Sequence, residues 1–170
     1  VEQHFPPAWQ LDDKALLAGA RTGNDWWLYT FPISGDTPEK LLNRKVKMAQ
    51  QTPDGQLWFS PGRNKGLWLL KKTAQVETVK QILPATVFNV SYQWQVADSA
   101  IYFVQEQADH VQFSRYDTTS EQLEAIVKLP TGTIDRMTTL TAIPSQNRVI
   151  FTQREFPKAD IKQLSDPAFK

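Results

Sequence analysis

The sequence predicts an all-β fold built from four consecutive antiparallel sheets. Three observations lead to this expectation. An apolar four-residue core recurs at a spacing of roughly forty to fifty residues. A polar turn precedes each core, and a second apolar strand candidate follows it. The four cores are Leu16-Leu17-Ala18-Gly19, Leu57-Trp58-Phe59-Ser60, Ile101-Tyr102-Phe103-Val104 and Val149-Ile150-Phe151-Thr152.

A repeat of this period with several short strands per unit is typical of the blades of a β-propeller. We therefore expect residues 1–170 to form a single, partial propeller domain. It belongs either to a larger propeller or to a small four-bladed ring. The expected repeats are approximately 8–44, 46–84, 90–130 and 136–165.

The first two repeats show the turn chemistry clearly. In the first, the polar turn Arg21-Thr22-Gly23-Asn24 predicts a hairpin, because its Gly can take a positive φ. In the second, Thr52-Pro53-Asp54-Gly55 is a strong turn signal, since Pro presets φ and Gly relieves it. The predicted strands are 15–20, 25–33 and 39–43, then 47–52, 56–60, 67–72 and 79–83.

The third and fourth repeats continue the pattern. Residues 121–128 contain helix formers, but β-branched Ile126 and Val127 and the register of the repeat favour a strand. The predicted strands are 92–96, 100–105, 110–116 and 123–129, then 137–143, 148–154 and 160–164. The chain ends soon afterwards, so the fourth repeat is expected to lack its outermost strand.

Composition predicts an aromatic core and narrows the function classes. The chain has six Trp, nine Phe and four Tyr, and Phe59, Phe103 and Phe151 occupy equivalent places that we expect to be buried between sheets.

Nineteen basic and eighteen acidic residues leave a net charge of +1, which argues against nucleic-acid binding. There is no Cys, hence no disulfide and no thiolate metal site. No apolar run approaches the ~20 residues of a membrane span, and no signal peptide begins at Val1, so we expect a mature or excised soluble piece without membrane insertion.

The sequence shows few residues in patterns that are typical of a catalytic site. The two histidines, His4 and His110, show no metal-ligand spacing and are interpreted as surface residues. Asp12, Asp13 and Asp54 lie where turns need a side chain that bonds backbone N–H groups. We expect no catalytic residue, no bound cofactor and no metal site, and therefore no enzyme.

Aromatic side chains and a polar loop tip are the candidate binding residues. Trp26 and the adjacent Trp27 should point to opposite faces of a strand, where packing is favoured over a sugar-stacking role. Arg63, Asn64 and Lys65 occupy a loop tip, where binding residues concentrate on rigid scaffolds. These three residues and Trp26 are the candidate contacts for a ligand or partner.

The repeats also resemble a known family. The segments Trp9-Gln10-Leu11-Asp12-Asp13-Lys14 and Gln51-Thr52-Pro53-Asp54-Gly55-Gln56-Leu57-Trp58-Phe59 are similar to the turn-and-strand motif of TolB-type, WD40-like propeller repeats. Gly66-Leu67-Trp68, Ala100-Ile101-Tyr102-Phe103 and Arg148-Val149-Ile150-Phe151 look like the C-terminal propeller of CadC-like membrane regulators. This second resemblance implies a periplasmic, non-enzymatic sensing module. The second and fourth repeats depart from the motif at Lys71-Lys72-Thr73-Ala74-Gln75 and Ile143-Pro144-Ser145-Gln146-Asn147.

Three other functions stay open: an accessory propeller of a prolyl-oligopeptidase-like hydrolase, a lyase with a metal on the propeller axis, and a carbohydrate-binding propeller. The expected partners are a protein or the remaining blades of a parent chain. Because four blades are few, we expect open faces to drive self-association. Alternatively, residues 1–5 supply the missing outer strand of the fourth repeat and close a ring.

Overall fold

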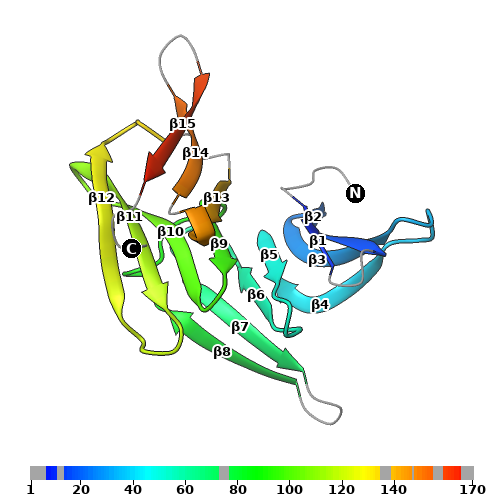
Figure 1. Ribbon diagram of the computed structural model, residues 1–170. Coiled ribbons are helices and arrows are strands. Elements are labelled where there is room, and N and C mark those ends of the chain that lie inside the picture. The colour runs from blue at the N-terminus through cyan, green and yellow to red at the C-terminus, as the bar shows by residue number, and fades with distance from the viewer. Residues whose placement is uncertain are drawn as a thin grey trace. The chain divides into compact units, whose positions relative to one another are not determined.

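A computed structural model describes residues 7–10, 14–72, 77–134, 139–146, 148–154 and 159–165. The chain divides into two compact units, Val1–Ser91 (unit 1) and Tyr92–Lys170 (unit 2). Figure 1 shows the strands of both, with unit 1 in blue to green and unit 2 in green to red.

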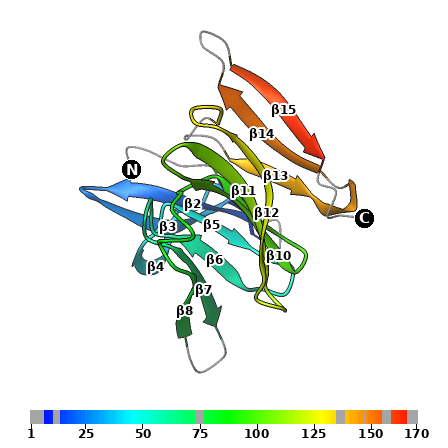
Figure 2. The same cartoon turned by 90° about the vertical axis from the view of Figure 1, so that its left-hand side faces the viewer.

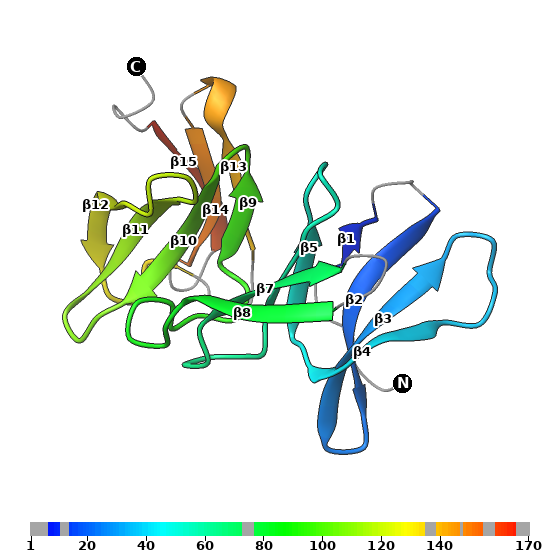
Figure 3. The same ribbon diagram turned by 90° about the horizontal axis from the view of Figure 1, so that it is seen from below.

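Unit 1 contains two antiparallel sheets of four strands each, in sequential order (Figure 3). The strands of the first sheet are β1 (Ala8–Trp9), β2 (Ala15–Thr22), β3 (Asp25–Pro32) and β4 (Glu39–Lys45). Those of the second are β5 (Met48–Gln51), β6 (Leu57–Ser60), β7 (Leu67–Lys72) and β8 (Glu77–Leu83).

Unit 2 contains a four-stranded and a three-stranded antiparallel sheet among the described residues (Figure 2). The first is formed by β9 (Trp94–Ala97), β10 (Ala100–Glu106), β11 (His110–Asp117) and β12 (Leu123–Pro130). The second is formed by β13 (Leu140–Ile143), β14 (Arg148–Arg154) and β15 (Ala159–Ser165). A single 3₁₀ turn, η1 (Pro144–Gln146), precedes β14.

The predicted fold class is confirmed: in the described part of the chain, every regular element except η1 is a strand, and the strands form four antiparallel sheets. The strand predicted over 123–129 is β12, so register outweighs helix propensity there. The fourth sheet has three strands in the described residues. The sequence interpretation did not include β1, which is only two residues long and too short to show a period.

The expectations of a single propeller domain and of the four repeat boundaries stay predictions. Residues 1–5, proposed above as a possible clasp, lie outside the described residues.

The core of unit 1 is mainly aliphatic. Side chains from both of its sheets form one buried cluster, against which Trp68 and Val79 pack. Its members are Leu17, Leu28, Leu42, Val46, Ala49, Leu57, Phe59 and Leu70. Alternation explains the contribution of β6, since Leu57 and Phe59 are two residues apart and share one face of the strand.

The core of unit 2 is more aromatic. Trp94 and Phe103 are fully buried, and the rings of Phe113 and Phe151 meet in a tilted arrangement with centroids 4.9 Å apart. That pair joins β11 to β14, and hence the two sheets of this unit. Phe59, Phe103 and Phe151 are 2%, 0% and 4% exposed, which confirms the predicted burial of all three.

The connection from β4 to β5 ties the two sheets of unit 1 together. The Val46 N–H donates to the Trp26 carbonyl at 3.0 Å, and the Lys47 N–H donates to the Ser60 carbonyl at 2.8 Å. The backbone of this crossover lies against Gly19 of β2. A Cβ added at Gly19 would stand 2.5 Å from the Lys47 carbonyl oxygen and 2.9 Å from that of Val46. Only a residue without a side chain fits there.

We expect Phe103→Ala to lower the free energy of unfolding by about 3–5 kcal/mol, because it leaves a cavity in a fully buried site. Chemical denaturation measures the change. Leu123→Ala is the control, since Leu123 is 46% exposed and should lose less than about 1 kcal/mol. A Phe103 loss as small as that of the control would show that the repeat register is wrong.

We expect Gly19→Ala to destabilise the protein by at least ~2 kcal/mol, because the added methyl group meets backbone atoms rather than a movable side chain. Thermal unfolding followed by circular dichroism in the strand region measures the effect. An unchanged melting temperature would contradict the close contact between β2 and the crossover.

Candidate functional site

The candidate binding residues gather at one end of unit 1. The antiparallel register places the β2–β3 turn, the β4–β5 crossover and the β6–β7 turn at the same end of the two sheets. We call this end the turn end. Turns at strand ends stay accessible when sheets pack through their faces, so binding residues of a propeller are expected in such turns.

The β6–β7 turn is held in a defined shape. Gly62, Asn64 and Gly66 all have positive φ angles, of 141°, 56° and 75°. The Gly62 N–H donates to Ser60 Oγ at 3.3 Å, and the Asn64 N–H donates to the Asn89 carbonyl at 3.4 Å. The turn is therefore anchored at its start and at its tip.

The other side of this turn is fixed through Lys65. Its carbonyl oxygen accepts hydrogen bonds from Trp68 Nε1 at 2.8 Å and from Gln81 Nε2 at 3.5 Å. Gly66 follows, and a Cβ there would meet the Gln81 side-chain nitrogen and the Leu83 carbonyl oxygen. The side chains of Arg63 and Lys65 are exposed on this anchored backbone.

The fourth predicted contact residue, Trp26, lies at the same end and is half-buried. Lys47 connects it to the turn. The Lys47 ammonium is 5.2 Å from the centre of the Trp26 ring, within the range of a cation–π contact. The methylene groups of Lys47 pass 3.8 Å from where a Cβ of Gly62 would stand. The structure therefore brings the four predicted residues to one end of unit 1, with Lys47 between Trp26 and the turn.

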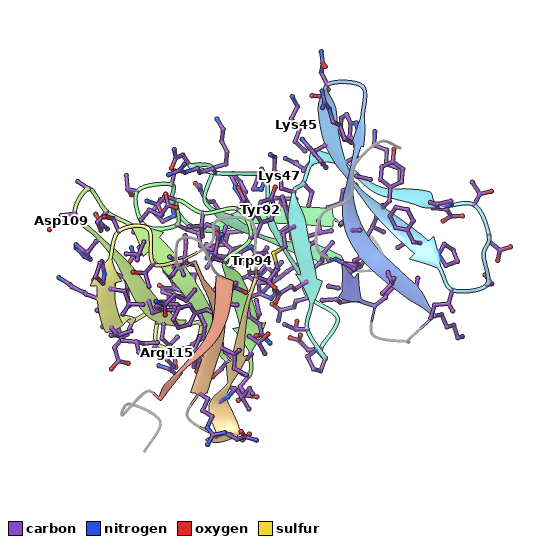
Figure 4. The ribbon with its side chains drawn as sticks, turned by 90° about the horizontal axis from the view of Figure 1, so that it is seen from above. Lys45, Lys47, Tyr92, Trp94, Asp109 and Arg115 are labelled. Atoms are coloured by element: carbon purple, nitrogen blue, oxygen red, sulfur yellow. The ribbon has the colours of Figure 1, made fainter. Side chains whose placement is uncertain are left out.

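Charge is unevenly distributed within unit 1. Six basic residues lie at or beside the turn end: Arg21, Arg44, Lys45, Lys47, Arg63 and Lys65. Figure 4 labels Lys45 and Lys47 on this side of the unit. Asp25 is the one acidic residue of the described part of unit 1 at this end, and it pairs with Lys45. The other described carboxylates of the unit, at Asp36, Glu39, Asp54 and Glu77, belong to the opposite strand ends.

The tryptophans divide between packing and half-buried positions. Trp58 and Trp94 are 4% and 0% exposed, as the packing interpretation expects. Trp27 is half-buried like Trp26, and the Lys40 ammonium lies 3.5 Å from the centre of its ring. A lysine ammonium thus lies within the range of a cation–π contact with each of the two neighbouring tryptophans.

The carboxylates and the histidine considered for catalysis make turn contacts. Asp54 accepts hydrogen bonds from Thr52 Oγ1 and the Gln56 N–H, and the Thr52 bond is the main reason that its pKa is lowered. His110, the first residue of β11, bonds Asp109 through Nδ1 at 2.7 Å. His4, Asp12 and Asp13 lie outside the described residues.

Asp117 shows the same use of a carboxylate. It accepts hydrogen bonds from the N–H groups of Ser120 and Thr119, both at 2.9 Å, and these lower its pKa to about 2. Arg115 pairs with its other oxygen at 2.9 Å. The group stays ionised at neutral pH and closes the β11–β12 turn.

The described residues contain neither a cluster of metal-ligating side chains nor a helix that could cross a membrane. His, Asp and Glu side chains do not gather in groups of three or more that could hold a metal ion. Helices long and apolar enough to cross a membrane do not occur in the part of the chain that is described.

Unit 1 also contains a cavity of about 210 Å³ between its two sheets, near the end opposite the turn end. It is lined by Gln10, Leu17, Leu41, Leu42, Gln51, Gly55, Leu57 and Leu70. The cavity is smaller than the ~300–1,000 Å³ typical of small-molecule sites.

Comparison with solved structures shows the fold. Over 94% of its length the chain resembles TolB from Acinetobacter baumannii, with a TM-score of 0.69 and 17% identity, and it covers 40% of that chain. A chain of a nidogen–laminin complex matches over 97%, with a TM-score of 0.67, 11% identity and 61% of its own length covered. Prolyl oligopeptidase B from Galerina marginata matches over 95%, with a TM-score of 0.54, 12% identity and 26% covered.

The four sheets are β-propeller blades. The chain spans less than two thirds of the TolB and nidogen–laminin chains that it matches. No protein-family model matches the sequence, and no curated protein does.

Sequence reasoning identified the β6–β7 turn and Trp26 but missed Lys47. The signal was present as the basic run Arg44-Lys45-Val46-Lys47. It could not be assigned to the site, because a run of charges usually marks a solvated surface. Only the crossover bonds and the strand register place Lys47 between Trp26 and Gly62.

We expect Gly66→Ala to destabilise the protein more than Gly55→Ala. Both glycines have positive φ, 75° and 83°, so both variants carry a similar backbone penalty of roughly 1 kcal/mol. Only Gly66 also has atoms in the way, at Gln81 and Leu83, whereas nothing lies within 4 Å of a Cβ at Gly55. Denaturant unfolding of the two variants measures the difference. Equal losses would show that the β6–β7 turn is not tightly packed.

Proposed function

We propose that this chain is a non-enzymatic interaction module that forms the periplasmic C-terminal propeller region of a membrane-anchored transcriptional regulator. In this proposal it binds a protein partner through the turns at its blade ends. Arg63, Asn64, Lys65 and Trp26 are the proposed contact residues.

One observation carries the interaction role: the turn end presents Arg63 and Lys65 on a backbone fixed by hydrogen bonds to Ser60, Asn89, Trp68 and Gln81. A turn that is ordered before binding loses little conformational entropy when a partner docks. The nidogen–laminin complex offers an analogy at the level of the fold, since a propeller-like chain there belongs to a protein–protein assembly.

The non-enzymatic role is supported by how the reactive side chains are used. Asp54 and Asp117 accept hydrogen bonds from turn groups, and His110 is bonded to Asp109. Ser60 Oγ and Ser114 Oγ are buried and take part in hydrogen bonds, to Val90 and to Gln105 respectively. Groups used in this way hold the fold together and do not form a nucleophile–base pair.

The proposal of a larger parent protein is supported by the share of the matched structures that the chain covers. The chain matches 40% of TolB and 61% of the nidogen–laminin chain, so further blades would complete a ring of ordinary size. The same observation supports one alternative function, an accessory propeller of a peptidase. The chain matches prolyl oligopeptidase B over 26% of that protein's length.

The test uses an antibody raised against the 170-residue chain. In the source cells we expect it to detect a longer polypeptide that sediments with membranes. Protease added to spheroplasts should remove the detected epitope, because the proposed propeller lies outside the inner membrane. A cytoplasmic protein in the same sample is the control and should stay intact.

Protection of the epitope in intact spheroplasts would contradict the periplasmic assignment. A native polypeptide no longer than the chain itself would contradict the regulator. Cleavage of a proline-containing fluorogenic peptide by the purified native protein would favour the peptidase alternative instead.

A further inference from the structure

The turn end of unit 1 combines a fixed loop, a half-buried tryptophan and a local excess of positive charge. We propose that the surface formed by Trp26, Lys47, Arg63 and Lys65, here called the basic turn surface, binds an acidic peptide segment of a partner protein. This proposal specifies the partner chemistry of the interaction role proposed above and rests on it.

The first argument is charge complementarity. The whole chain carries a net charge of only +1, from 19 basic and 18 acidic residues. Six of the basic residues lie at the turn end, where Asp25, already paired with Lys45, is the one carboxylate of the described part of unit 1. The positive field there is therefore much stronger than the net charge suggests. Such a field attracts carboxylate-rich segments and raises their association rate.

The second argument is geometric. Lys47 is held between the Trp26 ring, 5.2 Å from its ammonium, and the backbone at Gly62. Arg63 comes next in the chain after Gly62, so its backbone lies near the Lys47 side chain, and its own side chain is exposed. A guanidinium can bind a carboxylate with two parallel hydrogen bonds, and a neighbouring ammonium can bind a second carboxylate as a point charge. Trp26 adds an aromatic surface for an apolar side chain of the same peptide.

The third argument separates a peptide from a nucleic acid. Nucleic-acid binding needs a broad basic surface that neutralises many phosphates. The basic turn surface is confined to two turns and a crossover, and acidic residues Asp36, Glu39, Asp54 and Glu77 occur at the other strand ends of the same unit. An arrangement of this size suits a few carboxylates on one short segment.

The experiment measures fluorescence anisotropy of a short labelled peptide, rich in Asp and Glu and containing one Phe, on titration with the full chain. The same peptide with Asn and Gln in place of Asp and Glu is the ligand control. We expect the acidic peptide to bind and the neutral one not to bind. Its affinity should fall as salt is added, because exposed charges are screened within a Debye length of ~10 Å at 0.1 M salt.

Matched variants test the location. Lys47→Gln, Arg63→Gln and Lys65→Gln combined should weaken binding about tenfold, since three charge pairs near the surface are lost. Lys14→Gln, Lys71→Gln and Lys80→Gln combined remove the same charge from exposed positions away from the turn end and should leave the affinity unchanged. Lys47→Arg and Lys65→Arg combined keep the charge and should keep the binding. Thermal unfolding checks that each variant is folded.

Equal weakening by the two triple variants would overturn the proposal, because attraction would then be general rather than local. Binding of a single-stranded DNA of matched charge as tightly as the peptide would also overturn it, in favour of nucleic acid. No salt-dependent binding of the acidic peptide would do the same. Failure of the membrane and protease tests above would remove the regulator assignment without changing these affinities, so the two failures are distinguishable.

Discussion

The crossover between β4 and β5 is the constraint on which the rest of unit 1 depends. Two consecutive backbone N–H groups, of Val46 and Lys47, bond to different sheets, so adjacent residues link the two sheets at this point. Gly19 allows the crossover backbone to approach β2 more closely than any side chain would permit. The fully buried Val46 side chain joins the aliphatic cluster of both sheets at the same point. Hydrogen bonding, steric fit and apolar burial all act on two adjacent residues.

The same crossover links stability to the proposed binding role. Lys47 uses its N–H group to hold the second sheet and its side chain to bridge Trp26 and the β6–β7 turn. Hydrogen bonds from backbone and side-chain groups fix the backbone of the turn that carries the exposed Arg63 and Lys65. Binding residues are often carried by loops that a rigid scaffold positions.

The cores of the two units are built from different kinds of residue. Unit 1 relies on leucines from five strands with Phe59 among them, whereas unit 2 uses Trp94, Phe103 and the tilted pair of Phe113 and Phe151. Polar groups are also buried in unit 2, where Ser114 and Gln105 bond each other at 2.6 Å and Gln112 joins them. Satisfied in this way, a buried polar group costs little and helps to fix the register of β10 against β11.

The sequence by itself determined the all-β class and fourteen of the fifteen strands, through alternating apolar and polar residues, turn residues and a repeated apolar core. It also determined the burial of Phe59, Phe103 and Phe151. These features are local or repeat along the chain, so they can be read without knowing what packs against what. The exposed turn Arg63-Asn64-Lys65 was predicted for the same reason. Tertiary structure alone decided that β1 pairs with β2, that Gly19 must be small, and that Lys47 lies between Trp26 and Gly62. Each of these depends on two segments of the chain meeting at a particular register, and a one-residue change of register would place every side chain on the other face.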